Sequence, residues 1–294
     1  MLWGEERRFC FLYALTPIHA GAGQTLKAVD LPIQRERHTA WPMVQASGIK
    51  GALRDWCEKA WKNNGLNEDL VECIFGRTVE EGDNWAGAVT VTDARLLLFP
   101  VRANVAPFVH VTCPAVLKRF KEDLALLGQE VKVTFEVERE GFVPLKGGFP
   151  EKIILEDMPV NREDQNSSNS DDSFNSYLDQ VEKAVLVSDE VFGYLVRTAT
   201  EVQAHIAIDD DTGTAKDGSL RYQEYLPADS VLYFLAFFSE DRKPNSKCKE
   251  QGTRLLANDV ANLVTQAVST HLQIGGDFTL GKGICKVNWL GGKR

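Results

Sequence analysis

The chain of 294 residues contains no apolar run near the roughly 20 residues that a membrane span requires, so we expect no membrane partner. Its first ten residues carry Glu5, Glu6, Arg7 and Arg8 and offer no small-residue cleavage site, which argues against a secretory signal. The six cysteines are scattered, without a C-x-x-C pair. This pattern predicts a reduced cytoplasmic protein rather than a disulfide framework or a zinc site.

Motifs of several enzyme classes are missing or incomplete. No G-x-S-x-G occurs, and no His, Asp and Glu residues have the close spacing of metal ligands. Residues 276–283 nearly match a P-loop, but Gly283 replaces the Mg²⁺-binding hydroxyl and a strand is expected to follow. Residues 21–24 begin like a dinucleotide-binding motif, but the third glycine is missing. Neither ATP nor a dinucleotide is therefore the expected ligand.

Negative charge is concentrated in one segment. The net charge is −9, and residues 151–190 hold eleven acids against three bases, a local charge of −8. The remaining 254 residues sum to −1, and residues 27–54 carry a local charge of +3. The bases of that stretch are Lys27, Arg35, Arg37, Lys50 and Arg54. A basic stretch separate from an acidic one still permits a groove for a polyanion.

The first third of the chain contains a long irregular segment. Residues 9–15 form a continuous apolar run that is typical of a buried strand. Residues 17–46 then hold three prolines, two glycines and many charges without a stable period. A connection of about thirty residues is far longer than most loops of a compact domain, so we expect it to be functional.

A helix is predicted to start at Ser47, whose hydroxyl would accept a hydrogen bond from the first turn. Lys50 and Arg54 are four residues apart and therefore share one outer side of this helix. The inward face is predicted to consist of Ile49, Leu53, Trp56 and Ala60.

The rest of the chain mixes strand and helix patterns. Strands are predicted over 87–98, 130–138, 200–209, 220–226, 231–238 and 283–289, the third and fourth forming a long hairpin. Helices are predicted over 114–127 and 254–272, with short elements at 176–186 and 188–194. The polar segment 157–176 is predicted to be a mobile linker. Without these insertions the order is βαββαβ, which predicts an α+β fold of the ferredoxin-like or RRM-like kind.

The irregular segment carries one acid beside several bases. Asp30 lies close in sequence to His19, Arg35 and Arg37. A single loop carboxylate is often a cap or an ion-pair partner. Beside bound RNA it would instead deprotonate a ribose 2′-OH or hold a metal ion, with His19 as an acid–base partner or a structural histidine. The glycine-rich loop 275–283 with Lys282 likewise suits a phosphate or is an ordinary helix-to-strand turn.

Three stretches together resemble one family. The first runs from Thr16 through Val29-Asp-Leu-Pro-Ile-Gln-Arg-Glu36 to Ser47-Gly-Ile-Lys-Gly-Ala-Leu-Arg54. The second is the hairpin with Thr212-Gly-Thr-Ala215 and Glu224-Tyr-Leu-Pro227, and the third is the loop Gly275-Gly-Asp-Phe-Thr-Leu-Gly-Lys-Gly283. They are similar to the RAMP superfamily of CRISPR-associated proteins, and most of all to the repeated backbone subunit of type III-B (Cmr) effector complexes.

The resemblance implies a single domain over 1–294. Its parts are a modified ferredoxin-like palm (1–112 and 228–294), an inserted helical region (113–196) and a β-hairpin thumb (197–227). It also implies a ribonucleoprotein in which copies of the chain coat a guide RNA beside other Cmr-type subunits. The paired target RNA would be cut at regular intervals by an endoribonuclease that uses Mg²⁺ or Mn²⁺.

Residue roles follow from the same resemblance. Asp30 matches the catalytic aspartate, which would also hold the metal, and His19, Glu224 and Tyr225 match groups that would assist it. RNA contacts are expected from the basic stretch, the helix start, the hairpin tip and the glycine-rich loop. These are Lys27, Arg35, Arg37, Ser47, Lys50, Arg54, Thr212, Gly275, Gly276 and Lys282. Such groups recognise phosphates and sugars, as a coat for a guide of any sequence requires.

Three alternatives to a target-RNA endoribonuclease remain open. The first is an RNA-coating subunit without catalytic activity, the second is a ribonuclease that processes the guide, and the third is an enzyme of the same fold that acts on a small molecule. An inert assembly in the presence of Mg²⁺ or Mn²⁺ would favour the first. Cleavage of free repeat RNA by the monomer would favour the second.

Overall fold

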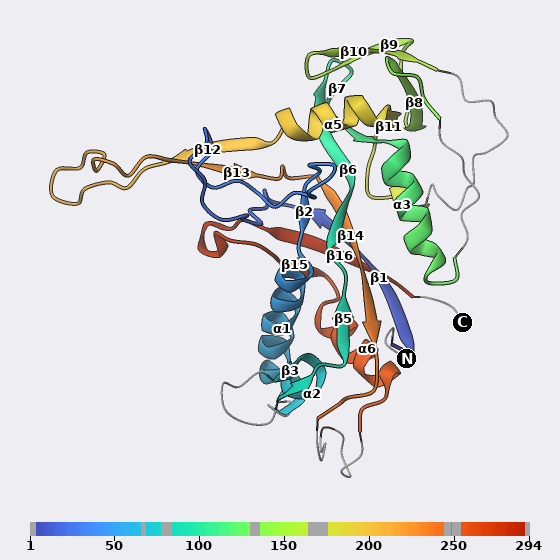
Figure 1. Ribbon diagram of the computed structural model, residues 1–294, viewed down its shortest axis with the longest axis vertical. Helices are drawn as coiled ribbons and strands as arrows, with labels where there is room; N and C mark the ends of the chain where they lie inside the picture. Colours follow the sequence, from blue (N-terminus) through green and yellow to red (C-terminus); the bar gives the residue numbers. More distant parts are fainter. Residues whose placement is uncertain are drawn as a thin grey trace.

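The computed structural model describes residues 4–65, 69–77, 84–129, 136–163, 176–243, 248 and 254–291. One half of its sheet contains β1 (Glu6–Ala14), β2 (Met43–Val44), β5 (Val89–Val91), β6 (Ala94–Ala103), β14 (Val231–Phe238), β15 (His271–Gln273) and β16 (Ile284–Gly291). The other half contains β7 (Ala106–Thr112), β8 (Gly141–Lys146), β9 (Lys152–Leu155), β10 (Met158–Arg162) and β11 (Ala184–Val187). The path through the sheet is β15-β16-β1-β14-β6-β7-β11-β8-β10-β9 (Figure 1).

The described helices are α1 (Ala46–Asn63), α2 (Asp69–Phe75), α3 (Pro114–Ala125), α5 (Asp189–Thr198) and α6 (Ala257–Ala267). Short 3₁₀ turns lie at Ser176–Leu178 and Phe278–Leu280, and a small ribbon pairs β3 (Gly76–Arg77) with β4 (Trp85–Ala86). Within this part of the chain, no helix is long and apolar enough to cross a bilayer.

The centre of the sheet is covered on both faces, which explains the apolar runs of β1 and β14. All eight residues of β14 are buried, and β14 pairs antiparallel with β1 and β6. On one face, Phe120 of α3 packs edge-on against Phe9 with ring centroids 5.4 Å apart. On the opposite face, Phe234 contacts Trp289, whose indole donates to the carbonyl of Val268 just after α6. The predicted strands 9–15 and 231–238 and the helix 114–127 are confirmed.

Several predicted boundaries are wrong because partners far along the chain decide them. The strand 87–98 is divided into β5 and β6 at Thr92 and Asp93. The helix 254–272 ends at Ala267, and Leu272 is buried as part of β15, opposite Cys285. The glycine-rich loop 275–283 therefore joins two paired strands and does not follow a helix.

The acidic region differs in a similar way. Strand β10 lies within the predicted linker 157–176, where it pairs with β8 and β9, and residues 164–175 lie outside the described part. The predicted helix 176–186 is a 3₁₀ turn followed by β11. Of the predicted strand 130–138, residues 130–135 lie outside the described part and 136–138 form no strand.

Helix α1 is capped by a residue from the break between β5 and β6. The helix begins at Ala46, and its N-cap residue Gln45 makes no side-chain capping bond. Asp93 supplies the missing acceptor, because its Oδ1 accepts the N–H of Ala46 at 2.7 Å. Ser47 is exposed in the first turn, so its predicted capping role is wrong.

This difference gives a stability prediction. Asp93→Ala removes the acceptor of the first turn and is expected to lower the free energy of unfolding by about 1 kcal/mol. Ser47→Ala removes no capping bond and is expected to leave it unchanged. Urea unfolding of both variants measures the difference, and equal losses would contradict the assignment of the cap to Asp93.

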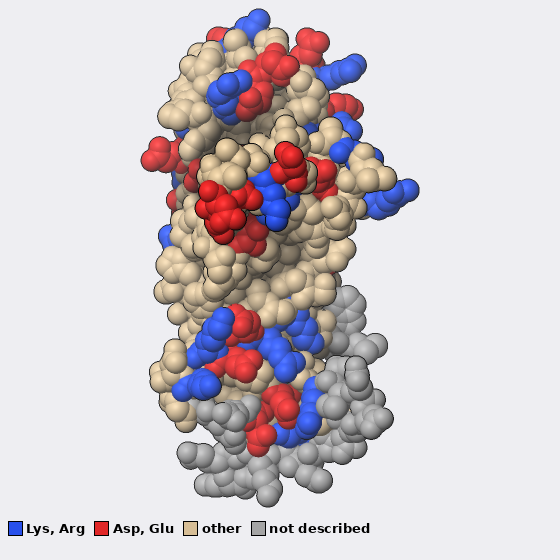
Figure 2. Space-filling model, turned by 90° about the vertical axis from the view of Figure 1, so that its left-hand side faces the viewer, with Lys and Arg blue, Asp and Glu red and all other residues tan. Residues whose placement is uncertain are grey.

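A hairpin of β12 (Glu201–His205) and β13 (Arg221–Tyr225) projects from the body of the molecule (Figure 1). Its two strands pair antiparallel from Glu201 opposite Tyr225 to His205 opposite Arg221, which confirms the predicted hairpin. Seen from the hairpin side, Lys and Arg side chains are interspersed with Asp and Glu and form no continuous basic face (Figure 2).

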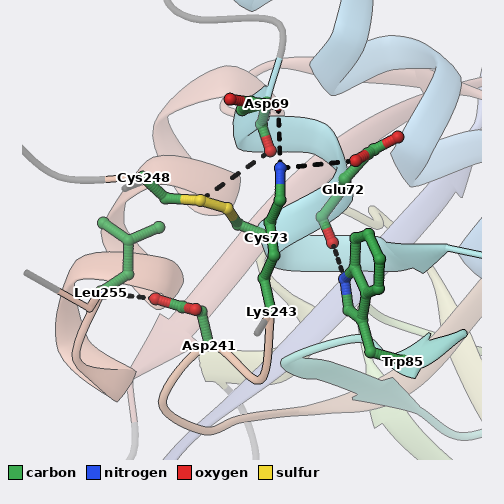
Figure 3. Close-up of a disulfide and its surroundings, with 8 residues drawn as sticks. All are labelled: Asp69, Glu72, Cys73, Trp85, Asp241, Lys243, Cys248 and Leu255. Carbon is green, nitrogen blue, oxygen red and sulfur yellow. Dashed lines mark hydrogen bonds and ion pairs between the residues drawn. A yellow bond between two sulfur atoms is a disulfide. The ribbon is translucent and has the colours of Figure 1, made fainter. Parts of the chain in front are cut away.

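Two cysteines far apart in sequence are joined. Cys73 of α2 and Cys248 form a disulfide with their Cα atoms 6.5 Å apart (Figure 3). Beside it, Lys243 Nζ contacts Asp69 Oδ1 at 2.8 Å and Glu72 Oε2 at 3.4 Å. The expectation of reduced cysteines is therefore wrong for this pair. The other four, Cys10, Cys57, Cys113 and Cys285, are free and buried.

Candidate functional site

The irregular segment 17–42 wraps around the hairpin root, which we define as the paired residues 201–205 and 221–225. Ile18 pairs with Leu226, and Leu31 forms a parallel bridge to Gln223. The segment is held from its other side by Arg119 of α3, which bonds both carboxylate oxygens of Glu36 and lies 4.7 Å above the ring of Trp41. A long loop without regular structure is thereby fixed against the hairpin.

Asp30 is bonded directly to the hairpin. Its Oδ2 accepts the backbone N–H of Tyr222 at 2.7 Å, and its own N–H donates to the Tyr222 carbonyl at 3.0 Å. The Asp30 carbonyl accepts the N–H of Thr25 at 2.9 Å. The side chain is half-buried, and its Oδ1 has no hydrogen-bond partner within the described residues. One carboxylate oxygen thus fixes the side chain while the other remains available.

His19 also contacts β13, two residues further along the strand than Asp30 does, at Glu224. It is buried, and its Nδ1 lies 2.8 Å from the Glu224 carbonyl. Because a carbonyl only accepts, Nδ1 carries the proton and Nε2 presents a lone pair in the neutral ring. A Cβ at Gly21 would lie 2.9 Å from Nε2, so glycine keeps the space before this nitrogen open.

Glu224 is a buried carboxylate with three donors. Arg35 Nη2 donates to Oε1 at 2.5 Å, Thr200 Oγ1 donates to Oε1 at 2.8 Å, and the Ile33 N–H donates to Oε2 at 3.0 Å. Arg35 also donates to the carbonyls of Ala40 and Val196. Both side chains therefore already have protein partners, and the predicted catalytic role of Glu224 and RNA contact of Arg35 stay predictions.

Tyr225 joins the hairpin to the glycine-rich loop. Its hydroxyl donates to Asp277 Oδ2 at 2.9 Å and lies 3.1 Å from His205 Nε2. Burial and the Asp277 carboxylate raise the pKa of Tyr225 far above its ordinary value, so the phenol stays protonated and is no proton acceptor near neutral pH. Lys282 Nζ lies 4.5 Å from the centre of this ring and 3.3 Å from Gln203 Oε1.

The glycines of the loop allow close backbone contact with the segment around His19. Gly275 has φ +83°, and a Cβ there would lie 2.5 Å from the His19 carbonyl oxygen. The Gly276 N–H donates to this oxygen at 2.7 Å. This N–H is therefore used within the protein, and the predicted contacts of Gly275 and Gly276 with RNA stay predictions.

The described part of the chain contains no group of three or more His, Cys, Asp or Glu residues arranged to hold a metal ion. Asp30, the predicted metal ligand, has one carboxylate oxygen without a protein partner among the described residues. Mg²⁺ is often held by one or two carboxylates together with substrate phosphates and water. The residues present fit such a shared ion and do not fit an all-protein metal centre.

The profile of the RAMP superfamily matches residues 11–286. This chain belongs to the RAMP superfamily. It is 34% identical over 290 residues to the CRISPR system Cmr endoribonuclease Cmr4 of Pyrococcus furiosus, covering 94% of this chain and 93% of that protein. The crystal structure of oligomeric Cmr4 from Pyrococcus furiosus is similar with a TM-score of 0.71 and 27% identity, covering 98% of this chain and 99% of that one.

A second solved structure supports the fold. A chain in the cryo-EM structure of the type III-B Cmr-beta complex bound to cognate target RNA has a TM-score of 0.77 at 21% identity. The alignment covers 98% of both chains. The mixed α+β architecture of this RAMP protein is thus shared with Cmr4 structures over nearly its full length.

The residues predicted to contact RNA in this RAMP chain differ in their exposure and in their hydrogen bonding. Lys27 and Arg37 are exposed, and their side chains have no bonded partner within the described residues. Lys50 is half-buried, and burial, followed by the charges of Arg54 and Arg242, lowers its pKa. Arg54 Nη1 donates to the Gly76 carbonyl at 3.2 Å.

Thr212 has a local role at the hairpin tip. Its N–H and hydroxyl both donate to Asp209 Oδ1 at 3.0 Å, and these bonds lower the pKa of the Asp209 carboxyl. The side chain thus folds back into its own turn. The predicted contact of Thr212 with RNA stays a prediction.

Sequence reasoning missed three polar residues that meet at the hairpin root of this RAMP protein. They are Gln223, His205 and Asp277. Gln223 lies two residues before Tyr225 and on the same face of β13, so strand alternation was the available signal. Asp277 lay inside a loop interpreted through its glycines and Lys282. Nothing in the sequence places it beside residues 203–225.

Proposed function

We propose that this chain is the backbone subunit of a type III-B CRISPR ribonucleoprotein that binds guide RNA and cleaves the complementary target RNA at regular intervals. The observation that carries the proposal is the position of Asp30, bonded to the root of the projecting hairpin with one carboxylate oxygen available. The family membership and the 34% identity to an endoribonuclease support it. The partners would be guide RNA, target RNA, further copies of the chain and other Cmr-type subunits in the cytoplasm.

The proposed parts follow the topology. Strands β16, β1, β14 and β6 lie side by side and antiparallel, and α1 and α6 contact each other through the Trp56 indole and the Ala267 carbonyl. This order supports a ferredoxin-like palm, which we propose for 1–112 and 228–294. The inserted region is assigned to 113–196 and the thumb to 197–227.

The proposed reaction is attack of a ribose 2′-OH on the adjacent phosphorus. The projecting hairpin displaces one target nucleotide from the guide–target duplex, which aligns the 2′-oxygen with the phosphorus and the leaving 5′-oxygen. Asp30 Oδ1 accepts the 2′-OH proton, and His19 is held at the same strand by the bond of its Nδ1 to the Glu224 carbonyl. The bond from phosphorus to the 5′-oxygen breaks as the bond to the 2′-oxygen forms, and the leaving 5′-oxygen takes a proton from water. The products are a 2′,3′-cyclic phosphate and a 5′-OH end.

Asp30 would also hold a Mg²⁺ or Mn²⁺ ion together with target phosphate oxygens. A bound divalent ion neutralises charge that develops on the phosphate. Asp30 supplies the protein ligand, while the Tyr222 N–H keeps the carboxylate oriented. The decisive test is the reconstituted ribonucleoprotein with labelled complementary RNA, with and without divalent ions. A regular fragment ladder is expected, and its absence under all conditions would overturn the enzymatic proposal.

One observation favours the alternative of a guide-RNA coat without catalytic activity. Of the four residues matched to the catalytic set, Glu224 and Tyr225 are already committed to protein partners. The same reconstitution separates the two functions. A coat protein would protect the guide and bind the target but leave it intact.

Guide binding is proposed to use phosphate contacts along α1, including Lys50. Because its pKa is lowered, Lys50 loses its charge at a lower pH than an ordinary lysine. Guide affinity of the wild type is therefore expected to weaken as pH rises, whereas Lys50→Arg stays charged and keeps its affinity. Lys50→Ala is expected to reduce the slope of log affinity against log salt by about 1. Filter binding across pH and salt measures both effects, and parallel pH curves for wild type and Lys50→Arg would contradict the contact.

A further inference from the structure

A cluster of polar side chains at the hairpin root is left without a role by the proposed reaction. It joins Gln203 and His205 of β12, Gln223 and Tyr225 of β13, and Asp277 of the loop between β15 and β16. The strand register places Gln203 opposite Gln223 on one face of the hairpin. Asp277 is the acceptor at its centre, because its Oδ2 accepts from both Gln223 Nε2 and the Tyr225 hydroxyl.

Burial and hydrogen-bond direction determine which partners the donors of this cluster have. Gln223 and Tyr225 are 3% and 0% exposed, so neither has water as a ready substitute partner. The Tyr225 proton is directed to the Asp277 carboxylate, and His205 Nε2 therefore donates to the Tyr225 oxygen. The chain His205, Tyr225, Asp277 thus runs in one direction, from the outer hairpin strand into the loop.

Asp277 is itself held rigidly. It has φ +58°, a conformation that few residues other than glycine adopt. Its carbonyl accepts the N–H groups of Leu280 and Lys282, and Gln273 of β15 donates to the carbonyls of Phe278 and Lys282. A carboxylate on such a braced turn is a fixed point to which the hairpin is attached.

We propose that Asp277 is a positioning residue that fixes the direction in which the hairpin projects, and thereby the target nucleotide that reaches Asp30. This inference rests on the proposed function. Asp30 is bonded to one edge of β13 through Tyr222, and Asp277 anchors the neighbouring Gln223 and Tyr225. Loss of the anchor leaves Asp30 intact but allows the hairpin root to rotate relative to the sheet that carries the loop.

The test uses a substitution that keeps the loop backbone. Asp277→Gly removes the carboxylate and tolerates the positive φ, so the loop is expected to keep its conformation. Glu156→Gly is the matched control. Glu156 lies in the turn between β9 and β10, also has a positive φ (+55°), and accepts the backbone N–H of Arg102 through its carboxylate. Asp277→Asn keeps one acceptor oxygen and serves as the conservative variant, and Tyr225→Phe removes only the hydroxyl donor.

In the reconstituted ribonucleoprotein, Asp277→Gly is expected to reduce the single-turnover cleavage rate at saturating target by tenfold to 100-fold, since small misplacements have such effects. The fragments are expected to become irregular in length while guide and target affinities stay unchanged. Tyr225→Phe is expected to show the same change more weakly, Asp277→Asn to recover most of the rate, and Glu156→Gly to match the wild type. A regular ladder at the wild-type rate from Asp277→Gly would overturn the inference.

A second measurement does not depend on cleavage. Amide hydrogen exchange of the RNA-free protein is expected to be faster at 201–205 and 221–225 in Asp277→Gly than in Glu156→Gly, because the hairpin root loses its anchor. Equal exchange in the two variants would overturn the inference even if no cleavage were seen. If Asp30→Asn cleaves like the wild type, or the wild type is inert, the proposed function fails instead, and the exchange result still decides the role of Asp277.

Discussion

Asp30→Asn is expected to reduce target-RNA cleavage by about 10²- to 10⁴-fold, the range that a general base contributes. The amide oxygen of Asn still accepts the Tyr222 N–H, so the loop stays attached to the hairpin while the proton acceptor is lost. Guide binding and assembly are expected to be unchanged, because no contact with the guide RNA is assigned to Asp30. Single-turnover cleavage of labelled target by the assembled complex measures the rate, and gel filtration with guide RNA measures assembly.

The matched control is Asp189→Asn. Asp189 also accepts a backbone N–H through one carboxylate oxygen, that of Ala115 at 3.0 Å, but it lies at the start of α5 and outside the proposed site. It is expected to cleave like the wild type. Equal cleavage by Asp30→Asn and Asp189→Asn would remove the catalytic assignment and leave a coat protein.

Glu224→Ala is expected to lower the free energy of unfolding by about 3 kcal/mol, because it leaves the buried donors of Ile33, Thr200 and Arg35 without their acceptor. The loss is placed at the lower end of the range for broken buried pairs, since the Arg35 side chain is 20% exposed and keeps two carbonyl partners. Glu224→Gln keeps acceptor oxygen and is expected to cost less. Urea unfolding monitored by tryptophan fluorescence measures both.

The same two variants distinguish a structural Glu224 from a catalytic one. For a structural residue, Glu224→Gln retains cleavage in proportion to its remaining stability. A folded Glu224→Gln protein that binds guide and target yet has lost cleavage as completely as Asp30→Asn would show that the carboxylate charge takes part in the reaction.

Sequence patterns predicted the parts of the fold in which burial follows a regular pattern along the chain. β1 and β14 are covered on both faces and therefore appear as unbroken apolar runs, and the β12–β13 hairpin alternates around a polar tip. The end of α6 was not predictable, because Leu272 continues the helical spacing although its burial comes from pairing in β15. The cap of α1 was missed for a similar reason, since Asp93 lies 47 residues from Ala46.

The site residues likewise differ in whether a local sequence pattern could identify them. Asp30 and His19 were singled out because a basic, irregular loop and a family resemblance both pointed to them. The pairing of Arg35 with Glu224 spans 189 residues, and that of Tyr225 with Asp277 spans 52. Contacts of this kind depend on how the finished sheet brings loops together, and no local pattern encodes them.

The position of β1 has a consequence for synthesis of the chain. β1 is synthesised long before its two neighbours β14 and β16, since Glu6 pairs with Phe238 and Arg8 pairs with Gly291. Its apolar segment Phe9–Leu12 therefore stays without its native strand partners until residues 231–291 have also been synthesised. Nascent chains that expose an unpaired hydrophobic strand for so long are prone to aggregate, so production of this protein is expected to benefit from a low expression level and abundant holdase chaperones.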